Sequence, residues 1–219
     1  MPNPVLYYDD ISPPVRSVLL TLAALGIKDK VDFKWIDLFS RGHLEESFVE
    51  LNPLHTVPVL QHDDLILTDS HAILMYLCDE YGMDSPFSLK DPKKRARVHN
   101  RLCFNNAVLF RRDSELFQQV FRGTIKNLSE HTKPIEEAFD YLESYLNESS
   151  FVACDELTIA DFSIVATLST AEIACPVNDG IRWPRLAAWY GKMKLLPYYE
   201  TENQIGLDKL KMKIKAALG

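Results

Sequence analysis

The stretch VLYYDDISPPVRS, residues 5–17, predicts a strand, a turn and the start of a helix in immediate succession. Residues 5–8 form a short apolar run that is typical of a buried strand. Pro13 and Pro14 favour the first positions of a helix, where a missing backbone N–H costs nothing. Ser12 therefore falls at or next to the N-cap. Its hydroxyl can cap the helix, as N-cap serines do, or join the helix N-terminus in holding an anion such as a thiolate.

Further strands and helices alternate through the first eighty or so residues. Apolar residues recur at helical spacing through residues 15–25. Val31, Phe33 and Trp35 then alternate with polar residues, which predicts a strand of period two. The other elements predicted for this part are a short helix within residues 41–51, a hairpin over residues 59–68 and a helix over residues 70–81.

The second half of the chain predicts helices only. Residues 82–91 combine glycine, serine and proline without periodicity, as linkers do. A long amphipathic helix is expected from Pro92 to about Arg122. Residues 157–174 are apolar on nearly all sides, which predicts the buried central helix of a bundle. The predicted organisation is an α/β domain over residues 1–82, a linker over residues 83–91 and an all-helical domain over residues 92–219.

Composition excludes several classes of function. The chain has 219 residues, of which 47% are hydrophobic and 25% charged, and its net charge is −7. An acidic protein of this kind is a poor partner for a nucleic-acid backbone. The four cysteines lack Cys-x-x-Cys spacing, so we expect reduced thiols rather than disulfides or a metal site. No stretch is typical of a signal peptide or a membrane span, so a soluble, cytoplasmic protein is expected.

Two further motifs can bind a peptide-like ligand. Pro58 precedes a predicted strand, and a cis bond there would turn the backbone of Val57 outward to pair with an extended ligand. Asp69 and Ser70 join a strand to a helix N-terminus, where Ser70 can bind a carboxylate and Asp69 an ammonium group. The simpler alternatives are an ordinary turn proline and an ordinary helix N-cap.

Together these motifs resemble those of cytosolic glutathione transferases, and the resemblance covers essentially the whole chain. SPPVR (residues 12–16), NPLHTVP (52–58) and DSHAI (69–73) are similar to the insect delta and epsilon classes, epsilon in particular. Thr158 and Asp161 match the capping box of the family's central helix. The resemblance implies a thioredoxin-like N-terminal domain, a helical-bundle C-terminal domain, glutathione as co-substrate and a homodimer.

The resemblance also implies residue roles. Ser12 would stabilise the glutathione thiolate as the catalytic residue. Tyrosine does this in other classes, but Tyr7 and Tyr8 precede the turn and lie within the predicted strand. The implied glutathione-binding residues are His43, His55, Val57, Pro58, Asp69, Ser70 and His71. His71 stands where delta-class enzymes often have arginine, and His43 can equally be a solvated loop residue.

The second substrate is expected between the domains. Phe110, Asp113, Ser114, Phe117 and Phe121 share one face of the long predicted helix. With Leu38 and Phe39 they can form an apolar pocket. Asp113 is the exception within this stripe. It either faces the pocket and meets a ligand hydroxyl, or is solvated and paired with Arg111 or Arg112.

The stretch FRRDS, residues 110–114, resembles the Noppera-bo group of epsilon-class transferases, which is implicated in insect ecdysteroid biosynthesis. That resemblance implies a steroid or sterol as second ligand, with Asp113 accepting its hydroxyl. The alternatives are a general detoxifying transferase or glutathione peroxidase, a non-catalytic sterol carrier, and a transferase-like scaffold module within a complex. The intact set of Ser12, Val57-Pro58 and Asp69-Ser70 favours an enzyme over a scaffold.

Overall fold

The computed structural model describes residues 2–177 and 181–219. The first part consists of β1 (Val5–Tyr8), α1 (Pro13–Leu25), a 3-10 turn (Lys28–Lys30), β2 (Asp32–Trp35), a 3-10 turn (Gly42–Leu44), α2 (Glu46–Leu51), β3 (Val59–His62), β4 (Leu65–Leu67) and α3 (Ser70–Tyr81). The second part consists of α4 (Pro92–Phe104), a π-helical segment (Asn105–Phe110), α5 (Arg111–Phe121), a 3-10 turn (Leu128–Glu130), α6 (Lys133–Glu148), α7 (Ile159–Ala171), α8 (Pro184–Lys194), a second π-helical segment (Glu200–Gln204) and α9 (Ile205–Leu218).

The strands form one mixed sheet in the order β2-β1-β3-β4. β1 runs parallel to β2 and antiparallel to β3, and β3 pairs antiparallel with β4. The register sets Leu6 beside Phe33 and Leu60, and Leu6 is fully buried. The inward position implied for Trp35 is wrong, since this side chain is 60% exposed. Because β2 is the edge strand and Trp35 ends it, the alternation does not carry this residue into the core.

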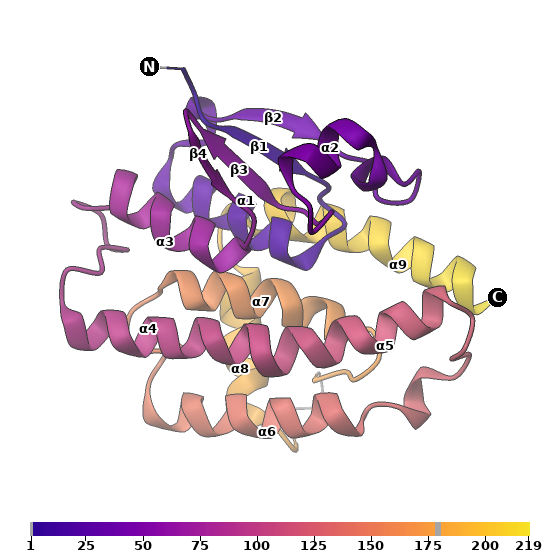
Figure 1. Cartoon of the computed structure of the whole chain (residues 1–219). Helices are drawn as coiled ribbons and strands as arrows, with labels where there is room; N and C mark the ends of the chain where they lie inside the picture. Colours follow the sequence, from indigo (N-terminus) through magenta and orange to yellow (C-terminus); the bar gives the residue numbers. More distant parts are fainter. Residues whose placement is uncertain (1, 178–180) are drawn as a thin grey trace.

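Helix α1 is buried from two sides. It lies with α3 between the sheet and the helical domain, and its far side packs against α7 (Figure 1). Residues 15–22 are therefore all buried, including Arg16, Ser17 and Thr21, although the apolar spacing marked only one inner face. Gly26 ends the helix in the left-handed conformation with φ of 66°, as glycine readily does at this position.

The helix predicted from Pro92 to about Arg122 is interrupted. Helices α4 and α5 continue one another in direction, but residues 105–110 between them are π-helical (Figure 1). A π turn takes up extra residues and so changes which side chains share a face. Asn105 is buried at its start. Residues 82–91, which join α3 to α4, contain no helix or strand; the domain boundary placed there stays a prediction.

Helix α7 is the buried centre of the second domain, as predicted, and every one of its residues is buried. Asp161 reaches back to its N-terminus, where its Oδ2 accepts hydrogen bonds from Thr158 N (2.8 Å) and Thr158 Oγ1 (2.9 Å). Together with the sheet and its helices, this confirms the predicted fold class of a thioredoxin-like domain followed by a helical domain. No helix in the described residues is both long and apolar enough to cross a lipid bilayer.

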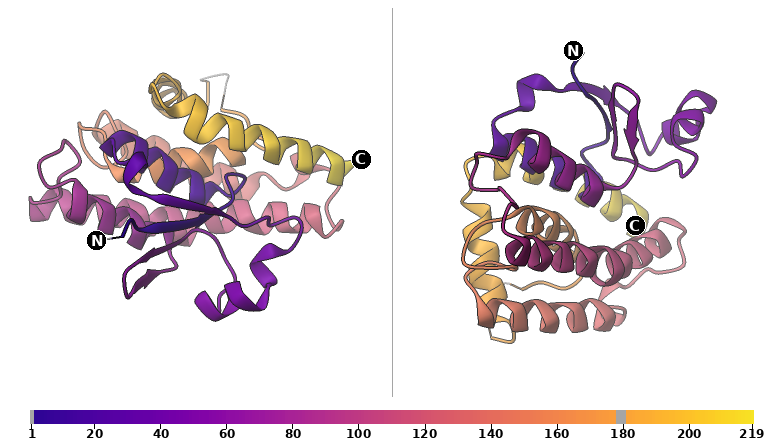
Figure 2. Two further views of the ribbon diagram at one scale, coloured as in Figure 1. Left: turned by 90° about the horizontal axis from the view of Figure 1, so that it is seen from above. Right: turned by 60° about the vertical axis from the view of Figure 1, so that its left-hand side comes forward.

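Helix α9 brings the C-terminal end of the chain back to the first domain. In both views of Figure 2 it lies beside α1. Gly206, in its first turn, allows this approach, because a Cβ there would lie 2.1 Å from the carbonyl oxygen of Asp10. α9 also packs against α5. The turn that leads into α1 is thus enclosed by elements from both domains.

Candidate functional site

Ser12 is the N-cap of α1, with Pro13 and Pro14 at the first helical positions. Its backbone N–H donates to the carbonyl of Asp9 (3.0 Å), which closes the turn. The hydroxyl makes no capping hydrogen bond, so the simple capping interpretation is wrong. A hydroxyl without a partner among the described residues therefore stands at a helix N-terminus, an arrangement that suits an anion.

Asp9 holds this turn against the neighbouring loop. Its carboxylate accepts hydrogen bonds from Ile11 N (3.3 Å) and from Leu38 N (3.1 Å). Burial raises the pKa of Asp9, and these backbone N–H groups partly offset that effect. The carboxylate ties the Ser12 turn to the loop that carries Leu38, so two parts of the site are held in one arrangement.

The two early tyrosines do not serve this site. The Tyr7 hydroxyl donates to Gln61 Oε1 (3.1 Å), and the ring of Tyr8 packs edge-on against Phe33. Neither tyrosine lines the cavities described below. This supports Ser12 as the hydroxyl of the site.

The Val57–Pro58 peptide bond is cis, and both residues are buried where the chain enters β3. Asn52 holds the preceding loop: its Nδ2 donates to the carbonyl of Thr56 (2.9 Å), and its Oδ1 accepts from Leu54 N (3.0 Å). Asn52 is fully buried. The motif NPLHTVP thus builds a loop whose shape is set by its first residue.

Asp69 and Ser70 begin α3. Asp69 is the N-cap, and its Oδ1 accepts hydrogen bonds from His71 N (2.8 Å) and Ala72 N (3.2 Å). Hydrogen bonding to the His71 side chain is the main reason that the pKa of Asp69 is lowered, so this carboxylate is ionised at neutral pH. Capping occupies only Oδ1, and the carboxylate is half exposed. Capping and ligand binding are therefore compatible at Asp69.

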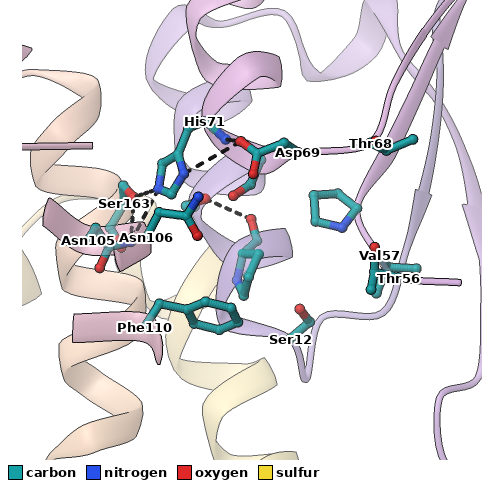
Figure 3. A pocket seen from close by; sticks show the side chains of 14 residues that line it. Ser12, Thr56, Val57, Thr68, Asp69, His71, Asn105, Asn106, Phe110 and Ser163 are labelled. Carbon is teal, nitrogen blue, oxygen red and sulfur yellow. Dashed lines mark hydrogen bonds and ion pairs between the residues drawn. The ribbon is translucent and has the colours of Figure 1, made fainter. Parts of the chain in front are cut away.

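His71 turns its ring toward the helical domain. Its Nε2 lies 2.8 Å from Ser163 Oγ in α7, and its Nδ1 lies 3.5 Å from Asp69 Oδ1 (Figure 3). Asn105 Nδ2 donates to the same Ser163 oxygen (2.8 Å). Sequence spacing did not find Asn105 or Ser163, because they come from two helices far along the chain. His71 thus links the Asp69 turn to the second domain.

The predicted residues surround two adjoining cavities. The first, of about 180 Å³, lies between α3, the Val57 loop and the start of α1, and Ser12, Val57 and Asp69 border it from three separate segments (Figure 3). The second is larger, about 670 Å³. The predicted residues that line the first cavity are Ser12, Val57, Pro58, Asp69, Ser70, His71 and Phe110. Those that line the second are Ser12, Leu38, Phe39, His43, His55, Val57, Phe110, Asp113, Ser114, Phe117 and Phe121.

His43 and His55 form a pair beside the Ser12 turn. Their ring centroids lie 6.3 Å apart, and both rings border the larger cavity. Burial lowers the pKa of His43, and the nearby His55 and Arg41 act in the same direction. His43 Nδ1 is buried and has no hydrogen-bond partner among the described residues.

Asp113 faces the larger cavity. It is 2% exposed, and its Oδ1 has no hydrogen-bond partner among the described residues. The alternative of a solvated aspartate paired with a neighbouring arginine is wrong. Arg111 pairs with Glu115 (2.8 Å), and Arg112 approaches Glu137 (3.5 Å). Burial raises the pKa of Asp113 well above its ordinary value.

The described residues contain no group of three or more His, Cys, Asp or Glu side chains arranged to hold a metal ion. All four cysteines are free thiols. Burial raises the pKa of Cys78 to about 12 and that of Cys175 to about 11, which makes both poor nucleophiles. The polar side chains that line the two cavities include hydroxyl, carboxylate and imidazole groups.

Comparison with known proteins agrees with this geometry. Residues 6–87 match the model of the glutathione S-transferase N-terminal domain, and residues 125–192 match that of the C-terminal domain. Glutathione S-transferase 1 of Manduca sexta is 37% identical over 97% of this chain and 98% of its own length.

Two solved structures share the whole fold. An epsilon-class glutathione S-transferase from the housefly Musca domestica has a TM-score of 0.92 and 38% identity, covering 98% of each chain. A glutathione transferase homologue of Drosophila mojavensis with bound glutathione has a TM-score of 0.91 and 37% identity, covering 99% of this chain and 98% of that one. The chain therefore belongs to the glutathione S-transferase family, as an enzyme that takes glutathione as its co-substrate.

Proposed function

We propose that this transferase activates the glutathione thiol at Ser12 and uses the adjoining cavity for a flat apolar second substrate, a steroid or sterol. One observation carries the proposal: Ser12, Thr56, Val57 and Phe110 line both cavities, so a sulfur held at Ser12 lies where they meet. A free thiol, with a pKa of about 8.5, is only slightly ionised at neutral pH. The Ser12 hydroxyl and the N-terminus of α1 favour the thiolate, which is the form that attacks an electrophile.

Glutathione lies along the smaller cavity in this proposal. Asp69 binds the ammonium and Ser70 the carboxylate of the γ-glutamyl end. The backbone of Val57, beside Pro58, pairs with the cysteinyl unit, and His43 and His55 contact the glycyl end. The ionised, half-exposed Asp69 carboxylate supports this direction of binding. The hydrogen bond of His71 to Ser163 and its contact with Asp69 support a role in holding that carboxylate.

Replacing Asp69 by asparagine is expected to raise the KM for glutathione about tenfold or more and to change kcat less. Asparagine keeps the oxygen that caps α3 and removes the charge, and a hydrogen bond to a charged group contributes about 1.5–3 kcal/mol. Steady-state kinetics with varied glutathione measure this. Asp91→Asn is the control, because Asp91 also caps a helix, accepting from Lys93 N and Lys94 N at the start of α4, and lines neither cavity. An unchanged KM in Asp69→Asn contradicts the proposed orientation.

The larger cavity suits a steroid in size and chemistry. Its volume, about 670 Å³, lies in the range of small-molecule sites. Leu38, Phe39, Phe110 and Phe117 provide an apolar lining, and Asp113 is the exception within it. An unpartnered buried carboxylate oxygen carries a free-energy cost that a ligand hydroxyl can relieve. A ligand that is apolar along its length with one hydroxyl at the end meets both requirements.

Replacing Asp113 by alanine is expected to weaken steroid binding about tenfold to 100-fold while leaving the KM for glutathione unchanged. Inhibition of chlorodinitrobenzene conjugation by a hydroxysteroid measures the steroid affinity. Ser114→Ala is the matched control, since the neighbouring Ser114 hydroxyl already donates to the carbonyl of Arg111 (3.1 Å). Equal steroid affinity in Asp113→Ala and the wild type contradicts the steroid site and favours a general detoxifying transferase or peroxidase.

The proposal extends to the biological setting. A steroid site with an acidic residue in the FRRDS stretch supports kinship with the Noppera-bo group and a role in ecdysteroid biosynthesis. Membership of the transferase family supports a homodimer. Four free cysteines suit the cytoplasm, where thiols stay reduced. Glutathione binding by a wild type that conjugates no electrophile would favour a sterol carrier instead.

A further inference from the structure

Arg122 lines the larger cavity at the end of α5 and has no acidic partner. Its side chain is exposed, and its Nη2 lies 3.4 Å from Oε1 of Gln118, an uncharged amide that lines the same cavity. Arg111, at the start of the same helix, differs because it pairs with Glu115 (2.8 Å). Within the described part of the chain, no carboxylate lies at ion-pair distance from Arg122. The wall of the cavity therefore carries a cation without a counter-charge.

Two aromatic rings and a lysine lie beside this cation. Phe39 and Phe121 both line the cavity, their ring centroids are 5.4 Å apart, and they are 41% and 40% exposed. Lys213, from α9, places its Nζ 4.6 Å from the centroid of the Phe39 ring. Helices α5 and α9 pack together and end at the same side of the molecule (Figure 1, Figure 2). We call Phe39, Phe121, Arg122 and Lys213 the cationic mouth of the cavity.

Two neighbouring charged groups have partners within the protein. The carboxylate of Asp37 accepts a hydrogen bond from Ser40 Oγ (2.6 Å). Hydrogen bonding to Ser40 is the main reason that the pKa of Asp37 is lowered, and Lys213 acts in the same direction from beyond ion-pair distance. Lys126, in the loop after α5, donates to a backbone carbonyl at the end of α9 (2.9 Å). Of these cations, Arg122 is the one that lines the cavity, so it is the one that a bound anion would meet.

Asp113 and Arg122 mark two ends of the cavity. Both belong to the wall that α5 forms, but Asp113 is 2% exposed whereas Arg122 reaches the solvent. An α-helix rises by about 1.5 Å per residue, so positions 113 and 122 lie about 13 Å apart along the axis. The rings of Phe117 and Phe121 line the wall between them. This arrangement suits a flat apolar body of several fused rings with a polar group at each end.

We propose that the larger cavity takes an amphipathic ligand whose hydroxyl end meets Asp113 and whose other end carries an oxyanion, a sulfate or a carboxylate, that pairs with Arg122. This inference rests on the steroid site proposed above and narrows its ligands to acidic or sulfated steroids. A guanidinium is planar and presents N–H donors that match two oxygens of such an anion. Lys213 adds a second positive charge at the cationic mouth. The cavity therefore prefers a ligand with an anionic far end to one with an uncharged far end.

The test uses three probes that share a saturated steroid skeleton with a hydroxyl on its first ring. The last ring carries a hydroxyl in the first probe, a sulfate in the second and a carboxylate in the third. Calorimetric titration at neutral pH, with glutathione present, measures the Kd of each probe. The quantity compared is the preference, which is the Kd of the uncharged probe divided by that of an anionic probe. The two anionic probes show whether the site takes a sulfate, a carboxylate or both.

The wild type is compared with Arg122→Gln and Arg111→Gln. Arg111→Gln is the matched control, because it removes an exposed guanidinium from the same helix at a position that lines neither cavity. We expect the wild type to bind at least one anionic probe about fivefold to tenfold more tightly than the uncharged probe. Arg122→Gln should lose most of this preference, and Arg111→Gln should keep it.

Ionic strength provides a second measurement of the same contact. Salt screens charges that are exposed to solvent, as those of the cationic mouth are. Raising the ionic strength from about 0.05 M to about 0.5 M should therefore lower the preference of the wild type several-fold. The preference of Arg122→Gln should change less. A preference of the wild type that does not respond to salt would contradict an ion pair at the mouth.

Asp113→Ala tests whether the two polar groups act at separate ends. It removes the partner of the hydroxyl that all three probes share, so it should weaken all three by a similar factor. Effects at sites more than about 10 Å apart are usually additive in free energy. The losses of sulfate affinity in Asp113→Ala and Arg122→Gln should therefore multiply in the double variant, to within about twofold. A larger departure would mean that both side chains contact the same part of the ligand, which contradicts the proposed arrangement.

Three further results overturn the inference while the steroid site stands. They are a wild type that binds all three probes alike, an Arg122→Gln variant with the preference of the wild type, and an equal loss of preference in Arg111→Gln. The last would mean that total charge, rather than Arg122, sets the preference. If none of the probes binds to the wild type, the steroid site itself is contradicted, and this inference with it.

Discussion

Replacing Ser12 by alanine is expected to lower kcat/KM for glutathione conjugation to chlorodinitrobenzene by about 100-fold at neutral pH. The change removes the free hydroxyl at the N-terminus of α1 and leaves the helix intact, because this hydroxyl caps nothing. Removal of one hydrogen bond donor to a developing or bound anion typically costs about 10²–10³ in rate. The measurement is initial-rate kinetics at several pH values. Activity of Ser12→Ala should recover as the pH approaches the pKa of a free thiol, about 8.5.

Ser17→Ala is the matched control for this experiment. Ser17 lies in the same helix and also borders the smaller cavity, but its hydroxyl donates to the carbonyl of Pro14 (2.7 Å). It should keep kcat/KM within a few-fold of the wild type. If Ser12→Ala retains full activity with an unchanged pH profile, another group stabilises the thiolate and the proposed role of Ser12 is wrong.

Replacing Asp161 by alanine is expected to destabilise the fold by about 4 kcal/mol. The fully buried carboxylate accepts hydrogen bonds from Thr158 at the start of α7, from Val152 N (3.0 Å) and from Trp189 Nε1 in α8 (3.0 Å). Alanine leaves these buried donors without an acceptor, and each such group costs about 1–3 kcal/mol. Because α7 packs against α1, the loss should also disturb the site. Urea unfolding followed by circular dichroism measures the effect.

Asp155→Ala provides the comparison in the same loop. Asp155 also accepts a backbone hydrogen bond, from Ser150 N (3.0 Å), but at an exposed position. Its loss is expected to change stability by about 0.5 kcal/mol. Similar destabilisation by both substitutions would mean that burial of the Asp161 hydrogen bonds does not determine their contribution.

Local sequence patterns predicted much of the fold. The predicted helix over residues 70–81 is present with those bounds, because Asp69 caps it and Gly82 follows it. The π-helical residues 105–110 had no local signal, since the apolar spacing on either side fits one uninterrupted helix. The exposure of Trp35 was missed for a related reason: alternation predicts a strand but not whether its end lies at the edge of a sheet.

The residues of the candidate site divide in the same way. Ser12, Val57 and Asp69 were found from sequence because each follows or precedes a turn whose chemistry is local. Whether Asp113 faced the cavity or the solvent could not be decided from spacing, since both arrangements satisfy the same pattern. The burial of Arg16 was not predicted from the sequence, although a charged residue between Val15 and Ser17 is unusual in so apolar a helix.

The sequence by itself determined the two fold classes, the position of Ser12 at a helix N-terminus and the apolar face that carries Phe110 and Asp113. These features depend on residues a few positions apart in the sequence. Their steric and hydrogen-bonding preferences can therefore be read from the residue types alone. Only the tertiary structure decided that Thr170 and Asp113 line one cavity, that Arg16 donates a hydrogen bond to Thr170, and that His71 binds Ser163. These contacts join helices that lie far apart in the sequence: α1 with α7, and α3 with α7. The packing of these helices against one another determines which polar groups are removed from water, and local sequence patterns do not contain that information.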